Sequence, residues 1–443
     1  MPAPTTVPHR LLVISDLHLT TGLDPVTGQW SPTEDFFWDA DFAEFLAYYT
    51  DGNPTTLIIN GDLVDFLQVL SIPNPEERVA FDISPDEIHP KYGLRDTEHA
   101  AEFLMVKVLN GHARFFEALA LFVGRGNELV IIKGNHDVQF FWPGVQRRLV
   151  DRLQELCVRN RLTFDPSRVR FAPWCYCIPG LIFVEHGNQY EGTTAFRNFF
   201  MPILPYDLPN GRRELELDLS GVLVRFMTNR VEPVNPLADN VRPFSGIYRL
   251  LWKEHPWVIL GTFTSAMRAL FRASRKRQLW RVRSIRQRYV EIRRLNDLER
   301  DEEARRCAPH DPDTAARLVE LFSVITGRLH RRPTLERSIW RFLKGRRQMM
   351  PNVSRLLRRS AQALAGVLET GFIIFGHAHY PDALLLGNGT WYFNSGSWIP
   401  TLLEPAPGYP NAWQFTFFLL ENGTGMLLRW VPERHQSEPF SVQ

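Results

Sequence analysis

The chain has 443 residues, 44% hydrophobic and 23% charged, an ordinary globular composition with room for more than one domain. Its cysteines are too few for a disulfide scaffold, and residues 1–10 lack the basic start and apolar stretch of a signal peptide, so a reducing, cytoplasmic compartment is expected. The longest nearly uncharged apolar stretch of the middle region, residues 256–267, is shorter than the about 20 residues of a membrane-spanning helix, which excludes a span. The four cysteines are Cys157, Cys175, Cys177 and Cys307.

Five short apolar runs are predicted as buried strands because each is bounded by glycine or polar residues. They are residues 11–15, 56–60, 129–133, 181–185 and 372–375. Between and after them we expect a helix over Asp39–Tyr49, a long helix over Glu98–Phe122, hairpin-like strands over 168–185, and hairpin turns at Gly387-Asn388-Gly389 and Asn422-Gly423. Parallel-type strands followed by late hairpins predict an α/β fold of two packed mixed sheets with outer helices.

Charge divides the chain into two units. The net charge is only +2, but residues 191–371 hold 34 basic and 19 acidic residues, a net charge of +15, and the remainder has a net charge of −13. Such a difference predicts two functional units. We expect a catalytic domain over 1–190 and 372–443, and a basic, mainly helical insertion over 191–371.

The insertion carries amphipathic helical patterns. They cover residues 268–294, 318–329 and 339–368, and the first has 11 basic residues against one acid, Glu291. Aromatic residues are interleaved with this basic cluster, namely Trp252, Trp257, Phe263, Phe271 and Trp280. A basic helix with an apolar face suits an anionic membrane surface. The alternative is a solvated helix whose apolar stripe packs within the insertion.

Each of the five predicted strands ends on polar residues of the types that bind metals. The clusters are Asp16-Leu17-His18, Gly61-Asp62-Leu63-Val64-Asp65, Gly134-Asn135-His136-Asp137, His186-Gly187-Asn188 and Gly376-His377-Ala378-His379. Ligands in open α/β sheets gather at the carboxyl ends of strands, so these clusters are expected to converge on one metal site. The other reading, carboxylate caps and core histidines, would bury uncompensated charges at considerable cost.

In this order the motifs resemble the calcineurin-like metallophosphoesterase superfamily, over roughly residues 10–190 and 372–430. The resemblance implies a four-layer αββα sandwich and two divalent metal ions. One ion would be bound by Asp16, His18 and His379. The other would be bound by Asn135, His186 and His377, with Asp62 bridging both. Asn394-Ser395-Gly396-Ser397 resembles the turn that follows the last motif in the superfamily.

The chemistry of such a site is hydrolysis of a phosphoester. Mixed carboxylate and imidazole ligands suit Mn²⁺, with Fe or Zn as alternatives. Two metals about 3.5–4 Å apart clamp the attacking and leaving oxygens and make a bridging hydroxide available near neutral pH. We expect His136 to stabilise or protonate the leaving oxygen, Asp137 to orient His136, and Asp65 to hold a ligand histidine. Because aspartate favours turns, loop capping by Asp65 and Asp137 stays open.

The substrate is a separate question from the reaction. Asp16-Leu17-His18-Leu19, the Gly61–Asp65 motif and a large helical insertion after His186 resemble the UDP-2,3-diacylglucosamine diphosphatase branch of the superfamily. That resemblance implies a phosphodiester or pyrophosphate bond in a UDP-sugar lipid, and a peripheral position on the inner membrane face. The chain differs from this branch by Gly-Asn-His-Asp in place of a motif with Arg at its third position. Its insertion is also much larger, with 190 residues between His186 and His377.

Two other functions remain open. A nuclease or nucleotide phosphodiesterase would use the basic insertion to neutralise phosphates, which makes nucleic acid the second candidate partner. A metal-binding scaffold without turnover is disfavoured by the complete ligand set. The sequence also disfavours a protein serine/threonine phosphatase, because Phe66 follows Asp65 where that family has Arg-Gly.

Overall fold

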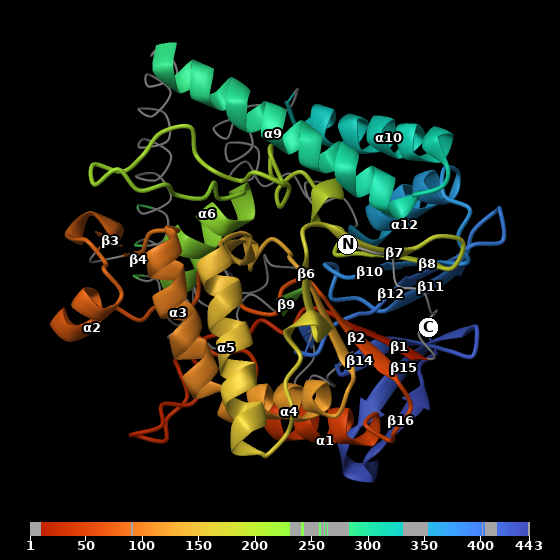
Figure 1. The fold of residues 1–443 in the computed structure, drawn as a ribbon, viewed down its shortest axis with the longest axis horizontal. Helices are drawn as coiled ribbons and strands as arrows, with labels where there is room; N and C mark the ends of the chain where they lie inside the picture. The colour runs from red at the N-terminus through yellow and green to blue at the C-terminus, as the bar shows by residue number, and fades with distance from the viewer. Residues whose placement is uncertain are drawn as a thin grey trace.

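Two mixed β-sheets pack face to face and carry helices on their outer sides (Figure 1). The computed structural model describes residues 10–89, 92–230, 241–242, 257, 261, 264, 283–330, 353–400, 402–403 and 414–441. The seven-stranded sheet has the strand order β16-β15-β14-β1-β2-β5-β6, and the five-stranded sheet has the order β11-β12-β10-β8-β7. The predicted four-layer αββα sandwich is therefore confirmed.

The strands of the larger sheet are β1 (Arg10–Ile14), β2 (Thr55–Asn60), β5 (Glu128–Ile132), β6 (Val169–Ala172), β14 (Thr416–Glu421), β15 (Thr424–Val431) and β16 (Gln436–Pro439). Those of the smaller sheet are β7 (Cys175–Ile178), β8 (Ile182–Glu185), β10 (Phe372–Phe375), β11 (Asp382–Leu385) and β12 (Trp391–Asn394). Two short ladders add β3 (Ile88–His89) with β4 (Gly93–Leu94), and β9 (Val241–Arg242) with β13 (Leu402–Leu403). The five predicted strands are thus β1, β2, β5, β8 and β10.

Both predicted late hairpins are present, but the strands over 168–185 differ from the expectation. β11 pairs with β12, and β14 with β15, in antiparallel register. β6 extends the larger sheet parallel to β5, whereas β7 and β8 form an antiparallel hairpin in the smaller sheet. The chain therefore crosses from one sheet to the other just after residue 172.

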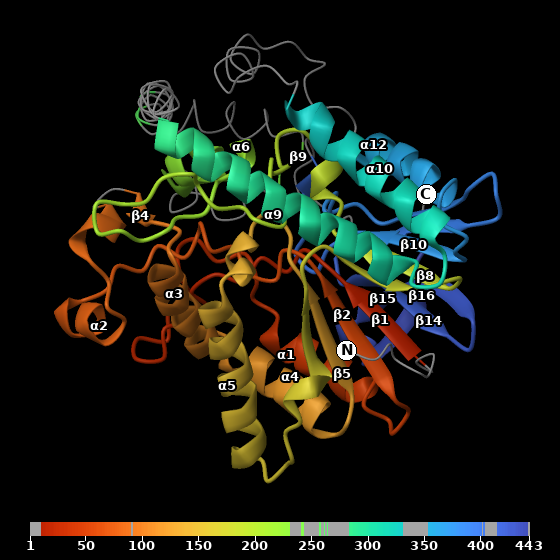
Figure 2. The same cartoon turned by 45° about the horizontal axis from the view of Figure 1, so that its top comes forward.

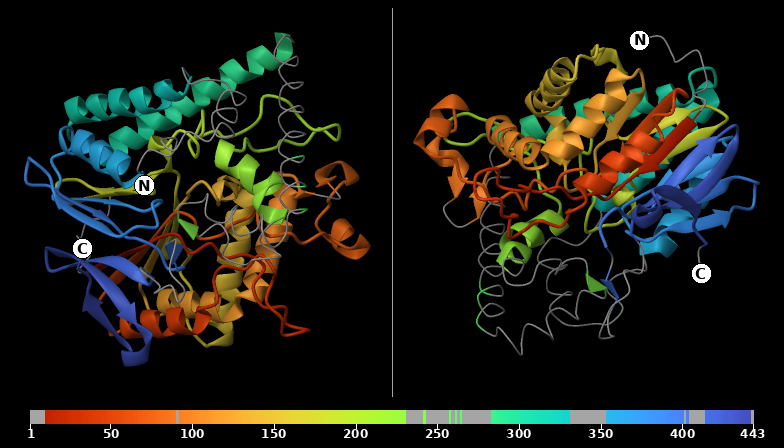
Figure 3. Two further views of the ribbon diagram at one scale, coloured as in Figure 1. Left: turned by 180° about the vertical axis from the view of Figure 1, so that it is seen from behind. Right: turned by 90° about the horizontal axis from the view of Figure 1, so that it is seen from below.

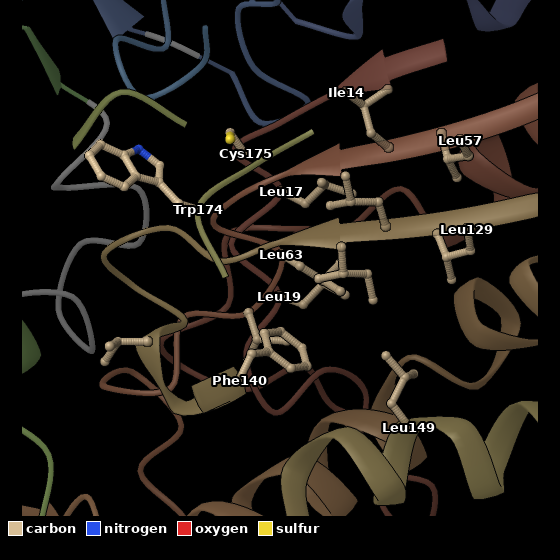
Figure 4. Close-up of a cluster of buried hydrophobic side chains, with 14 of the residues drawn as sticks. Ile14, Leu17, Leu19, Leu57, Leu63, Leu129, Phe140, Leu149, Trp174 and Cys175 are labelled. Atoms are coloured by element: carbon tan, nitrogen blue, oxygen red, sulfur yellow. The ribbon is translucent and has the colours of Figure 1, made fainter. Parts of the chain in front are cut away.

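Period-2 alternation explains how β1 is buried on both faces. Leu11 and Val13 point into the core between the sheets, and Leu12 and Ile14 into the core under the helices. A strand covered on both sides reads as a continuous apolar run, which is why the sequence shows no polar alternation there. Figure 4 shows Ile14 and its neighbours Leu57 and Leu129 from β2 and β5 in this second core, with Leu149.

Helices cover the outer faces of both sheets (Figures 1 and 3). The layer on the larger sheet has α1 (Asp39–Tyr48), α3 (Glu98–Gly111), α4 (Ala113–Gly124) and α5 (Pro143–Arg159). The layer on the smaller sheet has α9 (Arg283–Cys307), α10 (Pro312–His330) and α12 (Val353–Ala365), while α2 (Pro75–Ala80) and α6 (Leu219–Phe226) lie to one side. Short 3-10 turns occur at Pro85–Glu87, Val138–Phe141, Pro166–Arg168, Asn188–Tyr190, Thr228–Arg230 and Pro432–Arg434. Within the described ranges, every helix is too short or too polar to cross a membrane.

The long helix expected over Glu98–Phe122 is broken into α3 and α4. The break is at His112, which has a non-helical backbone (φ −108°, ψ 44°). Its buried ring contacts two carboxylates, with Nδ1 2.8 Å from Asp39 Oδ1 and Nε2 3.3 Å from Glu34 Oε2. We call His112, Glu34 and Asp39 the His112 cluster. Tertiary ion pairs of this kind override local helix propensity, so the helical pattern alone could not reveal the break.

The predicted helices of the insertion lie partly in the described ranges. α9 contains the end of the pattern over 268–294, α10 contains the pattern over 318–329, and α12 contains part of the pattern over 339–368. The remaining parts of the first and third patterns, residues 268–282 and 339–352, lie outside the described residues. So do Trp252, Phe263, Phe271 and Trp280, whereas Trp257 is 79% exposed. Figure 2, in which the top of the molecule is turned forward, shows α9 running diagonally across the molecule beside α10. The division into two domains stays a prediction.

Candidate metal centre

The predicted site residues lie on five loops that follow the carboxyl ends of five strands. β1, β2 and β5 are parallel neighbours in the larger sheet, and β8 and β10 are parallel neighbours in the smaller one. Parallel neighbours end on the same edge, so both sheets direct their loops to a common region. In that region the side chains form compact groups whose candidate ligand atoms lie within 4.8 Å of one another.

The first group consists of Asp16, His18 and His379. His379 Nε2 lies 3.2 Å from Asp16 Oδ1 and 3.2 Å from His18 Nε2. All three side chains are buried. Two imidazole nitrogens and a carboxylate oxygen that face one another at this distance form a suitable cradle for one divalent cation.

The second group consists of Asp62, His186 and His377. His186 Nε2 is 3.0 Å from Asp62 Oδ2, and His186 Nδ1 is 2.8 Å from the carbonyl oxygen of Asn60. A carbonyl can only accept, so Nδ1 carries a proton and Nε2 is the nitrogen directed into the site. A backbone carbonyl that fixes the tautomer is a common support for a metal-binding histidine.

Asp62 lies between the two groups. Its Oδ2 atom is 3.0 Å from His186 Nε2 and 3.8 Å from His18 Nε2. Its Oδ1 atom accepts a hydrogen bond from the backbone N–H of His136 at 2.9 Å. One carboxylate thus reaches both groups and the loop after β5, which is the position a bridging ligand requires.

The electrostatics of the site favour positive charge. Against the opposing effect of burial, His379 lowers the pKa of Asp16 to about 2, and His186 lowers the pKa of Asp62 well below its usual value. Conversely, Asp62 raises the pKa of His186 to about 9 although burial acts in the other direction. Burying carboxylates this completely costs free energy unless a cation lies beside them.

Backbone conformation also marks these loops. Five of the candidate ligand residues have positive φ angles, which are uncommon outside glycine, namely Asp16 (56°), His18 (52°), Asp62 (54°), His377 (67°) and His379 (53°). Such strained conformations tend to persist where a functional geometry is held by its surroundings. At Gly61 (φ 81°) an added Cβ would lie only 2.4 Å from His186 Nδ1, so the second motif requires glycine for both reasons.

His136 is held by Asp65, not by Asp137. His136 Nδ1 lies 2.5 Å from Asp65 Oδ2, and the same carboxylate oxygen is 3.7 Å from His18 Nδ1. Asp137 instead accepts hydrogen bonds from two backbone amides, those of Gly134 (2.6 Å) and Leu63 (2.8 Å). The expectation that Asp137 orients His136 is therefore wrong: Asp137 ties the loops after β5 and β2 together, and Asp65 takes the orienting position.

The turn Asn394-Ser395-Gly396-Ser397 supports the loops from both sheets. Asn394 Nδ2 donates to the carbonyl oxygen of Gly376 at 2.6 Å, and Ser397 Oγ donates to the carbonyl oxygen of Asp16 at 3.0 Å. Ser395 Oγ is 2.8 Å from Ser15 Oγ. The turn thus links the first and fifth motifs from behind and fixes the separation between their ligands.

Sequence reasoning missed two residues at the start of the insertion. Glu191 Oε2 lies 3.0 Å from His377 Nε2, and Thr194 Oγ1 lies 3.2 Å from the same nitrogen. The only signal in the sequence for these two residues was that they follow the fourth motif, His186-Gly187-Asn188, within a few positions. A carboxylate on one imidazole nitrogen orients the ring and leaves the other nitrogen for the site.

The residues present fit two divalent cations. Asn135 Oδ1 is buried, and no described residue donates a hydrogen bond to it. A buried amide oxygen in that state is costly unless a cation or another donor satisfies it. With the two groups and the intermediate Asp62, the donor set is carboxylate, amide oxygen and imidazole, a mixture suited to Mn, Fe or Zn.

Comparison with known proteins agrees with this geometry. Residues 9–262 match the family described as calcineurin-like phosphoesterase, a range that includes the first four motifs, whereas His377 and His379 lie beyond it. None of the curated proteins matches the chain. Because the match covers more than half of the 443 residues, the chain belongs to the calcineurin-like phosphoesterase family, whose members are hydrolases acting on phosphoric esters.

Proposed function

We propose that the protein is a dinuclear metal-dependent phosphoesterase that hydrolyses a phosphodiester or pyrophosphate bond. The observation that carries this proposal is Asp62 Oδ2, which lies 3.0 Å from His186 and 3.8 Å from His18 and so joins the two ligand groups. One ion would be held by Asp16, His18 and His379. The other ion would be held by Asn135, His186 and His377. Asp62 would contact both ions. When bound, the ions supply an activated water molecule and neutralise charge on the phosphoryl group.

The protein's own residues supply the proton and the geometry. Most of the His136 side chain is buried and 15% of it is exposed at the site, and Asp65, with Asp62, raises its pKa well above the ordinary value against the effect of burial. A protonated imidazole in this position donates to the leaving oxygen as the phosphorus–oxygen bond breaks. Asp65 fixes which nitrogen faces the substrate because it occupies Nδ1.

The reaction is tested with bis-p-nitrophenyl phosphate and Mn²⁺. We expect hydrolysis that depends on the added metal and that is abolished in Asp62→Ala and His377→Ala. His310→Ala, at an exposed position after α9, is the matched control and should retain wild-type rates. Wild-type turnover by either ligand variant would contradict the two-metal assignment.

For the substrate we favour an anionic lipid-linked nucleotide sugar such as UDP-2,3-diacylglucosamine. The described part of the insertion has a suitable surface, because α9 exposes Arg286, Arg293 and Arg294 together with Val290 (66% exposed) and Leu298 (51% exposed). Positive charge beside exposed apolar side chains suits a substrate with a diphosphate and acyl chains, or the surface of an anionic membrane. On this view residues 191–371 form a substrate-binding cap over a catalytic domain of residues 1–190 and 372–443, at the inner membrane face.

A substrate panel tests this assignment. It contains UDP-2,3-diacylglucosamine, cyclic nucleotides, single- and double-stranded DNA, and a phosphopeptide, each assayed with Mn²⁺, Fe²⁺ and Zn²⁺. Sedimentation with anionic liposomes at low salt provides the second arm, with Val290→Ser/Leu298→Ser expected to weaken binding. Cleavage of DNA without cleavage of the lipid would replace the lipid assignment by a nuclease, and absence of both liposome binding and lipid cleavage would remove it.

A further inference from the structure

Three of the four cysteines gather where the smaller sheet meets the insertion. Cys175 Sγ lies 3.4 Å from Cys307 Sγ, and Cys177 Sγ lies 3.5 Å from the carbonyl oxygen of Cys307. Cys175 and Cys307 are buried, whereas Cys177 is partly exposed. We call these three residues the thiol cluster. The fourth cysteine, Cys157, is buried in α5, where its thiol contacts the carbonyl oxygen of Ala120.

The cluster joins two elements that are far apart in the sequence. Cys175 begins β7, the edge strand of the smaller sheet, and Cys307 is the last residue of α9. Glu303, one turn earlier in α9, also contacts Cys175, because its Oε1 accepts from the backbone N–H at 3.3 Å. Figure 4 shows Cys175 next to Trp174, at the end of the core that continues under the helices. The cluster therefore lies at a contact between the catalytic sheet and the insertion.

We propose that Cys175 and Cys307 form a reversible disulfide that ties α9 to the catalytic sheet. A disulfide requires sulfur atoms about 2.05 Å apart, so the two sulfurs at 3.4 Å need to approach by little more than 1 Å. We expect rotation of the two side chains to supply this movement. Both sulfurs already face each other, which distinguishes this pair from two cysteines that merely share a core.

The oxidant is a low-molecular-weight disulfide such as oxidised glutathione. A thiolate of the cluster attacks one sulfur of the reagent, forms a mixed disulfide and releases one glutathione thiol. The second cysteine then attacks the protein sulfur of the mixed disulfide and releases the second glutathione. Two cysteine thiols are oxidised, one glutathione disulfide is reduced, and the two protons end on the two released thiols.

The chemistry predicts a slow and pH-dependent reaction. The hydrogen bond with Cys175 and burial raise the pKa of the Cys307 thiol well above its ordinary value. Because the thiolate is the attacking species, cross-linking is expected to become faster as pH rises. Cys177 is the most exposed thiol of the three, so the reagent is expected to react there first. Cys307 then displaces glutathione from Cys177, and Cys175 attacks the Cys307 sulfur and releases the Cys177 thiol, which leaves the Cys175–Cys307 bond.

The bond would close a long loop. Cys175 and Cys307 are 132 positions apart, and the segment between them includes β8, the candidate ligand His186 that follows it, and roughly the first two thirds of the insertion. In β7, Cys175 is paired directly with Glu185, the residue before His186. Oxidation would therefore fix the end of α9 beside the strand that carries a metal ligand, and would restrict the chain between them in the unfolded state.

The test uses the full-length protein incubated with oxidised glutathione and then blocked with N-ethylmaleimide. Chymotrypsin cleaves after Tyr176 and so separates Cys175 from Cys177. We expect mass spectrometry to find a peptide pair joined through Cys175 and Cys307, two hydrogen masses lighter than the separate peptides and lost after reduction. Non-reducing electrophoresis after a light proteolytic cut between residues 175 and 307 should keep the two fragments together.

Variants separate this proposal from other outcomes. Cys307→Ser and Cys175→Ser should each abolish the cross-link, and circular dichroism verifies that they fold. Cys157→Ser and Cys177→Ser should retain the Cys175–Cys307 bond, the latter with slower formation. A cross-link through Cys177, or three unmodified thiols in a folded, fully oxidant-treated protein, would overturn the proposal. Since the readout is a bond and not turnover, it stands or fails independently of the phosphoesterase assignment.

Discussion

His136 is not among the proposed metal ligands, although its ring lies beside His18 and Asp65 and its backbone contacts Asp62. Its main-chain N–H holds Asp62 Oδ1 at 2.9 Å, whereas its ring contacts Asp65 at 2.5 Å. A substitution of the ring therefore leaves in place the hydrogen bond that supports Asp62, the proposed bridging ligand. This separation lets catalysis and metal binding be measured independently.

We expect His136→Asn to lower kcat by about 10²–10⁴-fold while the metal content stays that of the wild type, because general-acid catalysis is lost but no ligand is removed. Asp65→Asn should lower kcat as well, and should alter the pH profile because the ring loses its charged partner. Steady-state kinetics and elemental analysis of the purified variants provide the measurement. Loss of bound metal in His136→Asn would show that the ring is a ligand.

Glu191 gives a second prediction at the scale of single residues. Its carboxylate contacts His377 Nε2 at 3.0 Å, so Glu191→Gln removes the negative charge that orients the ring. We expect metal affinity to fall by about 10–100-fold, as is typical for partners of ligating histidines. Calorimetric titration with Mn²⁺ measures the effect, and Glu320→Gln on the exposed side of α10 should leave the affinity unchanged. Unaltered affinity in Glu191→Gln would exclude a positioning role.

Among the elements, the junction of α3 and α4 shows how a buried charge overrides a helical pattern. His112 ends one helix and precedes the next, and its ring is fully buried between Glu34 and Asp39. Glu34 also accepts hydrogen bonds from the backbone N–H of Gly22 at 2.7 Å and from the hydroxyl of Thr20. The His112 cluster therefore fastens the loop after the first motif to the helical layer.

The cluster makes stability depend on pH. Burial alone would lower the pKa of His112, but Glu34 and Asp39 raise this pKa from 6.5 to about 9. A raised folded-state pKa contributes stability that is complete below pH 6.5 and is lost as pH rises through about 9. We expect urea unfolding to show a loss of about 3 kcal/mol over that window. His112→Gln should be less stable at neutral pH and should lack this slope; an equal slope in both proteins would assign the titration to another group.

For the whole molecule, the candidate metal ligands come from both sheets. Asp16, Asp62 and Asn135 follow strands of the larger sheet, and His186 and His377 follow strands of the smaller sheet. Ions bound between them would connect the two halves of the sandwich across the open end of the inter-sheet core. Metal binding should then raise the global stability of the protein as well as its activity.

We expect Mn²⁺ to raise Tm and a chelator to lower it. A ligand that binds only the folded state at 100 times its Kd adds about 2.7 kcal/mol to the free energy of unfolding. Differential scanning fluorimetry of the apo and Mn²⁺-loaded protein provides the measurement, and Asp62→Ala should remove the response. A Tm that is independent of metal in the wild type would contradict a site built from both sheets.

Much of this architecture was predictable because the strands that carry the motifs are buried on both faces. Runs such as Leu11–Ile14 and Leu129–Ile132 are apolar at every position, and the polar residues after them mark the sheet edge. Long-range contacts were not predictable in this way. The break at His112, the partner of His136 and the contact of Glu191 with His377 each depend on residues brought together by tertiary structure. The contact of Asp65 with His136, in the orienting role that was expected of Asp137, has the same origin, since both aspartates follow a strand and only geometry distinguishes them.

The position of β1 in the middle of the larger sheet has a consequence for synthesis of the chain. β1 pairs with β14, so Arg10 meets Glu421 across 411 positions, and His18 meets His379 across 361. At about 5–20 residues per second, the ribosome releases His379 roughly 20–70 seconds after His18. During that interval β1 lacks one of its two neighbours, and the first ligand group lacks a member. The nascent protein must therefore keep a sheet edge protected until β14 has been synthesised, and the candidate ligands can come together only after His379 has been added.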